Sequence, residues 1–476
     1  MNRRWWALVA VSLATFMTYL DNNVVNVALP TIQRDLGLTI SGLEWIVSGY
    51  ILVFAGLLPA GGRLADVFGQ RRIFMIGLTV FTLASTAAGL STDGTTLVLS
   101  RGVQGIGAAL LTPTALSLIP RIFPDTRERN TAVGLWSAVG ALALAFGPLT
   151  GGFISENWDW GWIYLINAPI GVLTLALGAW ALPRASERSS GSRLDLPGVL
   201  TSTTALFALT YALIEGEGRG WTSAITLGSF ALAAVAAVLF VVIERRVAQP
   251  MIDLSLFRDR VFSGGLTSMG LWSFGVFGIY FFTALWLQNV LGYSPVEAGA
   301  AFIPMALLIA ALAAVAPRIA ARFGTGPTVA TGLALMSGAA LALSFTGAGS
   351  AYADLLPWFL VYGLGAGLLV PLTTAVLDTL PAGRAGVASG TLNVSREVFG
   401  LLGITILGAV LNARQNSSLG TGAAPLTAFL DGYQLALVIA AAIIALGVPL
   451  SLLTLRRRSP QAPAVPEPQK VLEPVA

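Results

Sequence analysis

Two ionisable side chains lie inside long apolar segments of the sequence. Asp21 belongs to LDNNVVNVALP, within an apolar run over residues 6–29, and Arg101 lies about five residues into the run over 96–118. Charged groups at lipid depth are costly and are usually functional. If the first run crosses a membrane outward and the fourth inward, both side chains lie at a similar depth in its outer half. We therefore expect an Asp21–Arg101 pair, direct or through water; an ion pair that only fixes helix packing is the alternative.

A second pair of charges, Arg396 and Glu397, lies in the apolar run over 388–411. Adjacent residues on a helix point about 100° apart, so these two side chains need not pair. Glu397 could bind a proton if it faces a wet cavity, because burial disfavours the charged form of a carboxyl group. Asp378, at the inner end of its run, is expected to be solvated.

Amide side chains lie close to Asp21 and Arg101 in the sequence. Amides in an apolar helix supply hydrogen-bonding groups, and they either face a cavity or bond to a neighbouring helix. We expect a substrate cavity lined by Asn22, Asn26, Gln104 and Arg396.

The segment Gly61–Arg72, GGRLADVFGQRR, is expected to form a short charged loop between two apolar runs. It is either a tight basic turn or a gate element, in which glycines allow close backbone approach and the acid pairs with arginines or caps a helix. The residues expected to act in such a gate are Gly62, Asp66, Gly69, Arg71 and Arg72.

The run over 132–154 contains GPLTGG, with Gly147, Pro148, Gly151 and Gly152. Glycine permits close helix packing, whereas proline removes a helix hydrogen bond and introduces a bend. We expect a kinked packing helix that also serves as part of the conformational switch.

Composition limits the possible classes of protein. Of 476 residues, 55% are hydrophobic and 11% are charged, whereas a soluble domain has about 25% charged residues. The chain has no cysteine and no histidine, so a thiolate or imidazole metal site and a histidine proton carrier are excluded. Its single lysine, Lys470, follows no glycine-rich loop, which excludes a P-loop. We expect no cofactor, no metal and no nucleic-acid partner, and no nucleophile–base constellation suggests an enzyme.

Hydropathy and loop charge predict an all-α polytopic membrane protein with about 14 transmembrane helices. Only Arg34, Arg219 and Arg414 fall on one side of the predicted layout, and the other loop arginines fall on the opposite side, so both termini are expected in the cytoplasm. The predicted spans cover 6–29, 43–61, 73–91, 96–118, 132–154, 162–182, 198–214, 223–243, 263–287, 298–316, 328–346, 355–378, 388–411 and 431–455.

An internal repeat divides the chain. GRLADVFG at 62–69 matches PRIAARFG at 317–324 at an offset of 255 residues, and Gly105–Pro113 resembles Gly363–Pro371 at nearly the same offset. Ordered matches of this kind indicate duplicated halves. We predict a six-helix half over 1–183, a linker with two inserted helices over 184–262, a second six-helix half over 263–455 and a disordered tail over 456–476.

Together these segments resemble the 14-span drug:proton antiporter family of the major facilitator superfamily, the EmrB/QacA type. LDNNVVNVALP resembles its first-helix motif, with Asn23 where threonine is usual, and LSRGVQGIGAA resembles its fourth-helix motif. GPLTGG resembles the antiporter motif of the fifth helix. The loop at Gly61–Arg72 resembles the family's loop between helices 2 and 3, with Val67 and Gln70 at positions that are usually basic.

The resemblance implies that Arg101 acts in proton coupling, that the Gly-Pro bend acts in antiport and that Asp66 helps to hold the cytoplasmic side closed. We assign Asp21, Arg101 and Glu397 to proton coupling. The expected function is proton-coupled export of amphipathic or lipophilic compounds by rocking of two halves, driven by the proton gradient, with the protein embedded in the lipid bilayer of an inner membrane. Dedicated export of one antibiotic, metabolite or lipid, uptake by symport, and a non-transporting sensor or scaffold are the alternatives. A monomer is one option for the oligomeric state.

Overall fold

The computed structural model describes residues 2–183, 195–247, 250, 252–377, 379 and 385–455. Within these ranges every regular element is a helix. Residues 184–194 of the predicted linker region, the predicted tail from 456 and Asp378 lie outside them. The helices are α1 (Arg3–Leu36), α2 (Ile40–Phe68), α3 (Gln70–Gly89), α4 (Gly94–Ile122), α5 (Thr126–Asn157), α6 (Trp162–Leu165), α7 (Asn167–Ala181), α8 (Leu196–Arg219), α9 (Ala224–Glu244), the 3-10 helix η1 (Leu254–Arg258), α10 (Arg260–Asn289), α11 (Pro295–Ala301), α12 (Ile303–Phe323), α13 (Thr325–Leu343), α14 (Tyr352–Gly367), α15 (Val370–Leu377), α16 (Ala385–Gly420), α17 (Pro425–Ala445) and α18 (Gly447–Thr454).

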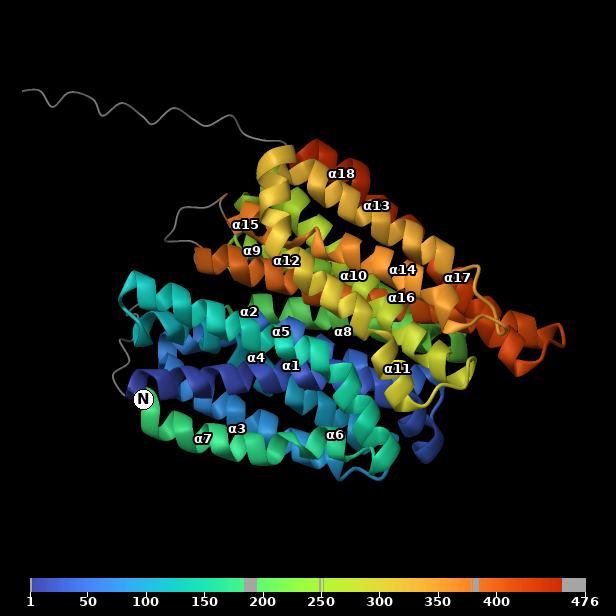
Figure 1. The fold of residues 1–476 in the computed structure, drawn as a ribbon, viewed down its shortest axis with the longest axis horizontal. Coiled ribbons are helices and arrows are strands. Elements are labelled where there is room, and N and C mark those ends of the chain that lie inside the picture. Colours follow the sequence, from blue (N-terminus) through green and yellow to red (C-terminus); the bar gives the residue numbers. More distant parts are fainter. Residues whose placement is uncertain are drawn as a thin grey trace, which may run out of the picture.

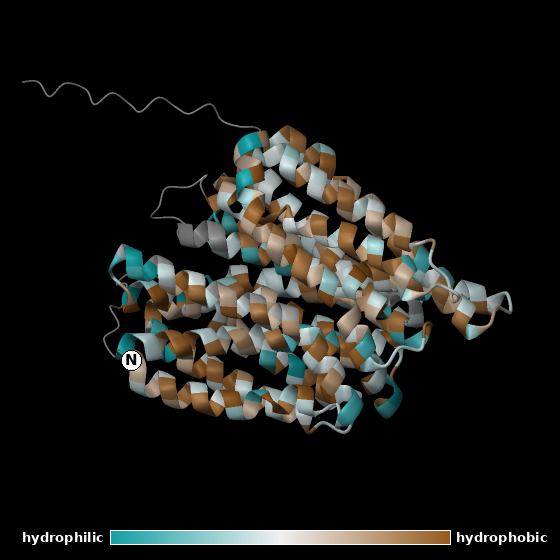
Figure 2. Cartoon of the chain, viewed as in Figure 1, coloured by the Kyte–Doolittle hydropathy of each residue, from teal (hydrophilic) through white to brown (hydrophobic). Residues whose placement is uncertain are grey.

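Thirteen helical segments of the described chain are long and apolar enough to cross a membrane. They coincide with thirteen of the fourteen predicted spans. The predicted span at 132–154 lies within α5, a helix of 32 residues that is not among the thirteen. The all-helical polytopic fold is therefore confirmed. Figure 2 shows apolar residues along the outer surfaces of the helices and polar residues gathered at the two ends of the bundle, as a bilayer requires.

The helices form two groups (Figure 1). In one group α1 to α7 pack together, mainly through contacts of α2 with α4, α3 with α4, and α1 with α5. In the other, α10 to α18 pack mainly through contacts of α10 with α16, α16 with α17, and α13 with α14. We call these groups the N-terminal half and the C-terminal half.

Matching glycines show the repeat in the backbone. Gly37 and Gly292, which are 255 residues apart, have φ angles of 62° and 69°. Gly69 and Gly324, at the same offset, have φ angles of 96° and 94°. A positive φ is strained for residues with a β-carbon, so glycine is favoured at each of these four turns.

Helix contacts repeat as well. A β-carbon on Gly105 of α4 would lie 2.6 Å from the Tyr50 carbonyl oxygen of α2, and one on Gly363 of α14 would lie 2.8 Å from the Met305 carbonyl oxygen of α12. Tyr50 and Met305 are again 255 residues apart. Small residues allow helices to approach this closely, so the repeated GIGAALLTP and GLGAGLLVP segments explain the equivalent packing.

The expectation of a loop over Gly61–Arg72 is wrong. α2 continues to Phe68, only Gly69 interrupts the helical backbone, and α3 begins at Gln70. The predicted span ended near residue 61 because the sequence becomes less apolar there. A helix can nevertheless continue into water when its residues favour the helical conformation. Gly61 lies at a close helix contact, because a β-carbon there would lie 2.0 Å from the Ala109 carbonyl oxygen.

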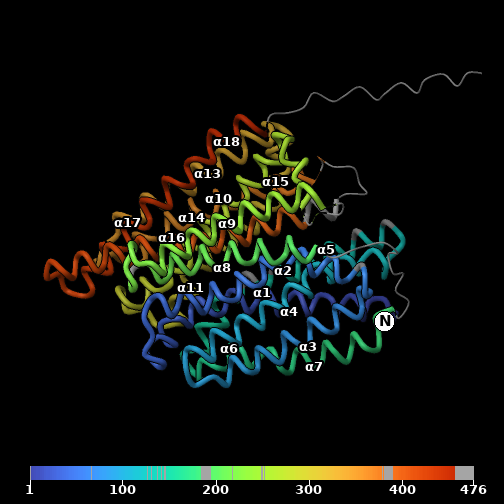
Figure 3. The backbone as a smooth tube through the Cα atoms, turned by 180° about the vertical axis from the view of Figure 1, so that it is seen from behind, coloured from blue at the N-terminus to red at the C-terminus, as the bar shows by residue number. Residues whose placement is uncertain are grey.

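The inserted helices α8 and α9 lie beside the junction of the two halves (Figure 3). α8 packs against both α2 and α16, whereas α9 packs against α8 and exposes apolar residues such as Leu232 and Val238. The indole of Trp45 on α2 donates to Glu215 on α8 over 3.0 Å, and the hydroxyl of Ser41 donates to the Ile214 carbonyl. These bonds attach α8 to the N-terminal half.

The two halves touch toward one end of the bundle, which we call the Gly37 end after the turn between α1 and α2. There Gln288 of α10 donates to the Val27 carbonyl of α1 over 2.8 Å, and Glu156 of α5 accepts from the backbone nitrogen of Val296 over 3.1 Å. α5 also packs closely on α11. The bundle is therefore closed at the Gly37 end.

Candidate functional site

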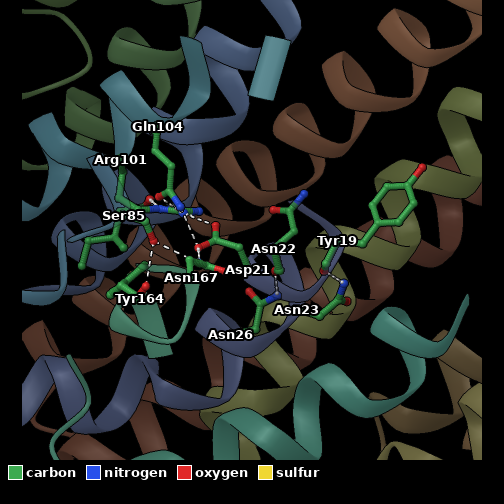
Figure 4. A network of polar contacts seen from close by, with 11 residues as sticks. Tyr19, Asp21, Asn22, Asn23, Asn26, Ser85, Arg101, Gln104, Tyr164 and Asn167 are labelled. Carbon is green, nitrogen blue, oxygen red and sulfur yellow. Dashed lines mark hydrogen bonds and ion pairs between the residues drawn. The ribbon is translucent and has the colours of Figure 1, made fainter. Parts of the chain in front are cut away.

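The carboxylate of Asp21 is the centre of a buried polar network in the N-terminal half (Figure 4). Its Oδ2 atom forms an ion pair with Nη1 of Arg101. Its Oδ1 atom accepts from Gln104 over 2.8 Å and from Asn167 over 3.2 Å. Asp21 is 1% exposed and Arg101 is fully buried. The structure thus places the expected Asp21–Arg101 pair in direct contact, without water between them.

Arg101 is held on several sides. Its Nη1 atom also donates to Gln104 over 2.7 Å, and its Nε atom donates to the Ile46 carbonyl over 3.2 Å. The guanidinium carbon lies 4.2 Å from the centre of the Tyr50 ring and 5.6 Å from that of Tyr164. A planar guanidinium can donate in several directions and stack on rings at once, which an ammonium cannot do.

Three network residues were not identified in the sequence analysis as members of this site. Asn167, the first residue of α7, donates to Asp21 and also to the Ser85 hydroxyl over 3.0 Å. Ser85 on α3 in turn donates to the Tyr164 carbonyl over 2.9 Å. Ser85 and Asn167 are fully buried, and Tyr164 is too. A buried asparagine in the apolar segment WIYLINAPIG is the signal that could have indicated this part of the site.

Close helix packing brings these residues together. Gly105 and Gly107 on α4 face α2 and α3, where β-carbons would lie 2.6 Å from the Tyr50 carbonyl oxygen and 2.5 Å from the Phe81 nitrogen. The turn of α4 that carries Arg101 and Gln104 is therefore drawn toward α1 and α2. The pattern RGVQGIG thus supplies both the polar side chains and the space that they need.

The geometry fits an ionised Asp21. A carboxylate accepts hydrogen bonds and cannot donate them, and here both oxygens face donors. Among the described residues, Oδ2 accepts from Arg101 alone, so a proton that binds Asp21 there removes the charge that Arg101 faces. Loss of the acid's charge would leave Arg101 buried without its counter-charge, which is strongly unfavourable. The network therefore ties the carboxylate of α1 to α4 and α7.

The C-terminal half holds its own charge pair. Arg396 donates to Oε1 of Glu397 from Nη2 over 2.7 Å and from Nε over 3.1 Å. The side chains of these adjacent residues pair because the long arginine folds back along α16. Glu397 is 1% exposed, whereas the side chain of Arg396 is 26% exposed. The Tyr19 hydroxyl of α1 is among the groups that act on Arg396, so this pair lies near the N-terminal half.

The four residues expected to line one substrate cavity differ from one another in their burial and in their hydrogen-bond partners. Gln104 is fully buried within the Asp21 network rather than at a cavity wall. Asn26 is 9% exposed and donates to the Asn22 carbonyl, one turn earlier on α1. Asn22 and Arg396 are both half-buried. Figure 4 shows Tyr19 on the opposite side of α1 from Arg101, so α1 carries the network on one face and other polar groups on another.

The segment expected to act as a gate lies at the end opposite Gly37. Arg71 donates to the Ala179 carbonyl over 2.8 Å, at the last turn of α7 within the same half. Arg72 is exposed, and Gly69 forms the turn between α2 and α3. A β-carbon on Gly62 would lie 3.7 Å from Pro113, which is an ordinary contact. Asp66 lies in α2, and its side chain is outside the described part of the structure.

The GPLTGG segment of α5 packs on both halves. β-Carbons on Gly147 and Gly151 would lie 2.6 Å from the Asn23 side chain and 2.4 Å from the Val24 carbonyl oxygen of α1. A β-carbon on Gly152 would lie 2.3 Å from the Pro295 carbonyl oxygen of α11. Pro148 meets α11 in turn, since a β-carbon on Gly299 would lie 2.4 Å from its carbonyl oxygen. The motif therefore forms part of the contact between the halves.

Potential metal ligands are scattered in the part of the chain that the structure describes. There, no group of three or more Asp, Glu, His or Cys side chains is arranged to hold a metal ion. The buried carboxylates instead face amides and guanidinium groups.

Comparisons with known proteins show the family of this chain. A family model described as Major Facilitator Superfamily matches residues 11–404. The chain is 37% identical over 471 residues to a puromycin resistance protein of Streptomyces alboniger, covering 97% of this chain and 93% of that protein. It is 37% identical to the multidrug resistance protein Stp of Mycobacterium tuberculosis, covering 88% of this chain and 78% of Stp. It is also 37% identical to a methylenomycin A resistance protein of Streptomyces coelicolor, covering 85% of each chain.

Solved structures show the same fold at low sequence identity. A bacterial homologue of the human lysosomal transporter Spinster, in an inward-facing and occupied conformation, superposes with a TM-score of 0.71. The two share 17% identity, and the match covers 97% of this chain and 99% of that one. A peptide transporter of the POT family, in an auto-inhibited form, superposes with a TM-score of 0.68 at 15% identity and covers 98% of this chain and 99% of the other.

Proposed function

Because this chain belongs to the major facilitator superfamily, we propose that it exports amphipathic or lipophilic compounds in exchange for protons, by alternating access of its two halves. The observation that carries the proposal is the buried network in which Asp21 pairs with Arg101. Such a network is a proton site that can sense the packing of α1 against α4 and α7. Relatives named for puromycin, multidrug and methylenomycin resistance support export of drug-like compounds.

The end opposite Gly37 is proposed to face the cytoplasm of a cell whose inner membrane holds the protein, with both termini on that side. The positions of arginines support this orientation, because arginine is enriched in the cytoplasmic loops of membrane proteins. Arg3, Arg71, Arg72 and Arg121 lie at that end. With the Gly37 end closed, substrate would enter from the cytoplasm or from the inner leaflet of the bilayer.

Proton movement supplies the driving force in this scheme. A proton that moves inward down a potential of ~100 mV gains about 2.3 kcal/mol. After the halves rock and open the Gly37 end, the outer medium reaches the polar face of α1 and a proton binds at Asp21. Return to the state with the Gly37 end closed restores the donors around Asp21 and releases the proton inward. Glu397, with its Oε2 atom buried and without a hydrogen-bond partner, is a second acceptor in this scheme.

Transport in energised, inverted membrane vesicles that contain the protein tests the proposal. A pH-sensitive dye reports the internal acidity, and a panel of cationic and neutral amphipathic compounds is added in turn. A substrate of an antiporter should release protons from the vesicles, and Asp21→Asn should abolish this release. If no compound releases protons while labelled compounds still accumulate, the protein transports without proton exchange.

Dedicated export of one antibiotic or metabolite is the second candidate. It is favoured by relatives named for single compounds, such as methylenomycin A and tetracenomycin C resistance proteins. The same vesicle panel separates the two candidates. A response to one chemical scaffold alone supports the dedicated exporter, whereas responses to several unrelated scaffolds support multidrug export.

A further inference from the structure

Glu44, on the second turn of α2, is fully buried and belongs to neither charge pair described above. Its Oε1 atom accepts a hydrogen bond from the side chain of Asn412 over 3.2 Å. Asn412 lies on α16, so this bond joins the N-terminal half to the C-terminal half. It lies about 6 Å along α2 from the start of the helix, near the Gly37 end.

The carboxyl group rests directly on the backbone of α16. A β-carbon on Gly408 would lie 2.2 Å from Oε1 and 2.4 Å from the carboxyl carbon of Glu44. Gly408 precedes Asn412 by one helical turn, so both residues lie on the face of α16 that meets α2. Burial of Glu44 therefore depends on contact between the two halves. When α2 and α16 separate at the Gly37 end, this carboxyl group meets water.

The surroundings of Glu44 favour a neutral carboxyl group. Its Oε2 atom is buried and makes no hydrogen bond, and the ion pairs found among the described residues do not include it. An ionised carboxylate buried without a cation is expensive, whereas a protonated one is much less so. The negative charge of Glu215 on α8 repels an ionised Glu44 and so increases the free-energy cost of ionising it.

Charged groups on the helices around α2 are already engaged. On α8, Glu215 pairs with Arg219 over 3.2 Å. Arg101 of α4 pairs with Asp21 of α1, as described above. On α16, Arg396 pairs with Glu397, and Arg414 lies 3.9 Å from Asp431 of α17. The remaining charged residues of these helices toward the Gly37 end are Arg34 and Asp35 on α1, Asp93, which caps α4, and Glu217 on α8, whose side chain lies outside the described part of the structure.

We propose that Glu44 is a proton-binding group that controls closure of the Gly37 end. It holds a proton while α2 and α16 are in contact, and it releases the proton to water on the Gly37 side when they separate. Proton binding and closure then stabilise each other, because linkage between two equilibria is reciprocal. The inference rests on the alternating access proposed above. In that scheme, acid on the outer side would drive the return to the state that loads substrate.

A distance measurement tests this directly and needs neither substrate nor transport. Because the chain has no cysteine, Asp35→Cys and Ser417→Cys place two spin labels at exposed positions, one in each half at the Gly37 end. Distances are recorded in lipid nanodiscs between about pH 5 and pH 8. We expect the ratio of long to short distances to rise with pH, by up to about tenfold per pH unit for one linked proton.

Three variants in this labelled background decide the role of Glu44. Glu44→Gln is neutral and similar in shape, so it should keep the short distance at every pH. Asn412→Asp places a second carboxyl group against Glu44 and should reduce the short-distance population at a given pH. Glu156→Gln is the matched control, because Glu156 also bonds across the halves but is exposed; it should respond to pH as the unmodified protein does.

Specific results would overturn the proposal. One is a distance distribution that does not change with pH in the unmodified protein. Another is a Glu44→Gln variant that retains the full pH response, or a Glu156→Gln variant that loses it. The spin labels report only the packing of the two halves. The result of the distance measurement therefore does not depend on whether the vesicle assay finds a transported compound.

Discussion

The guanidinium carbon of Arg101 lies 4.2 Å from the centre of the Tyr50 ring, and both side chains are buried. The Tyr50 phenol also feels the charges of Asp21 in its own half and of Glu397 in the other half. Both charge pairs therefore act on one aromatic ring of α2. A change in the charge of either pair can reach the other through this ring and the packing of α2 on α16.

Removing the Tyr50 ring should weaken coupling more than removing its hydroxyl. Tyr50→Phe keeps the ring face that Arg101 covers, whereas Tyr50→Leu loses a cation–π contact worth about 1–2 kcal/mol when desolvated. We expect substrate-induced proton release to fall roughly tenfold in Tyr50→Leu and to change little in Tyr50→Phe. Initial rates in inverted vesicles at equal protein density measure this. Equal loss in both variants would assign the effect to the hydroxyl instead.

Arg101→Lys should be nearly as harmful as Arg101→Ala. The guanidinium donates to Asp21, Gln104 and the Ile46 carbonyl at once, and a lysine ammonium cannot reproduce that planar set. Substrate-induced proton release and export are compared for the two variants. Full activity of the lysine variant would show that Arg101 acts only as a point charge.

Asp21→Asn should abolish proton-coupled export while the protein still reaches the membrane. The variant leaves Arg101 buried without its counter-charge, at a cost of about 3–5 kcal/mol, so its melting temperature should fall as well. Adding Arg101→Gln to Asp21→Asn removes both charges, and this double variant should recover stability but not proton release. Proton release at the normal rate in Asp21→Asn would remove Asp21 from the mechanism.

The sequence predicted the Asp21–Arg101 contact because helix rise and alternating span direction set the depth of each side chain. The asparagine in the apolar segment WIYLINAPIG signals a polar site, but the sequence could not assign Asn167 or Ser85 to Asp21, since the rotation of each helix about its axis depends on packing against several neighbours. The pairing of Arg396 with Glu397 was missed for a different reason. Adjacent residues point apart at the β-carbon, but a long arginine side chain can fold back to its neighbour.

Helix ends show a further limit of hydropathy. The apolar pattern of α2 stops near Gly61, yet the helix continues to Phe68, because Leu64 and Ala65 favour helix whether or not lipid surrounds them. The positive φ of Gly69 is what ends it. Asp66 therefore lies on a helix rather than in a loop. If Asp66 helps to hold the end opposite Gly37 closed, as the resemblance implies, Asp66→Asn should shift the population toward the state that is open at that end. The same spin-label method measures this shift, with labels at the end opposite Gly37.

The contact between α5 and α11 gives the last prediction, because glycines on both helices leave no room for a side chain. A β-carbon on Gly152 would lie 2.3 Å from the Pro295 carbonyl oxygen, and one on Gly299 would lie 2.4 Å from the Pro148 carbonyl oxygen. Backbone atoms cannot move aside as a flexible side chain can, so Gly152→Ala or Gly299→Ala should push the halves apart at the Gly37 end. Gly134→Ala on α5 is the matched control, since nothing lies within 4 Å of a β-carbon there. Spin labels at the Gly37 end should report longer distances for the first two variants and unchanged ones for the control. Unchanged distances in all three would show that α5 and α11 are not a closing contact.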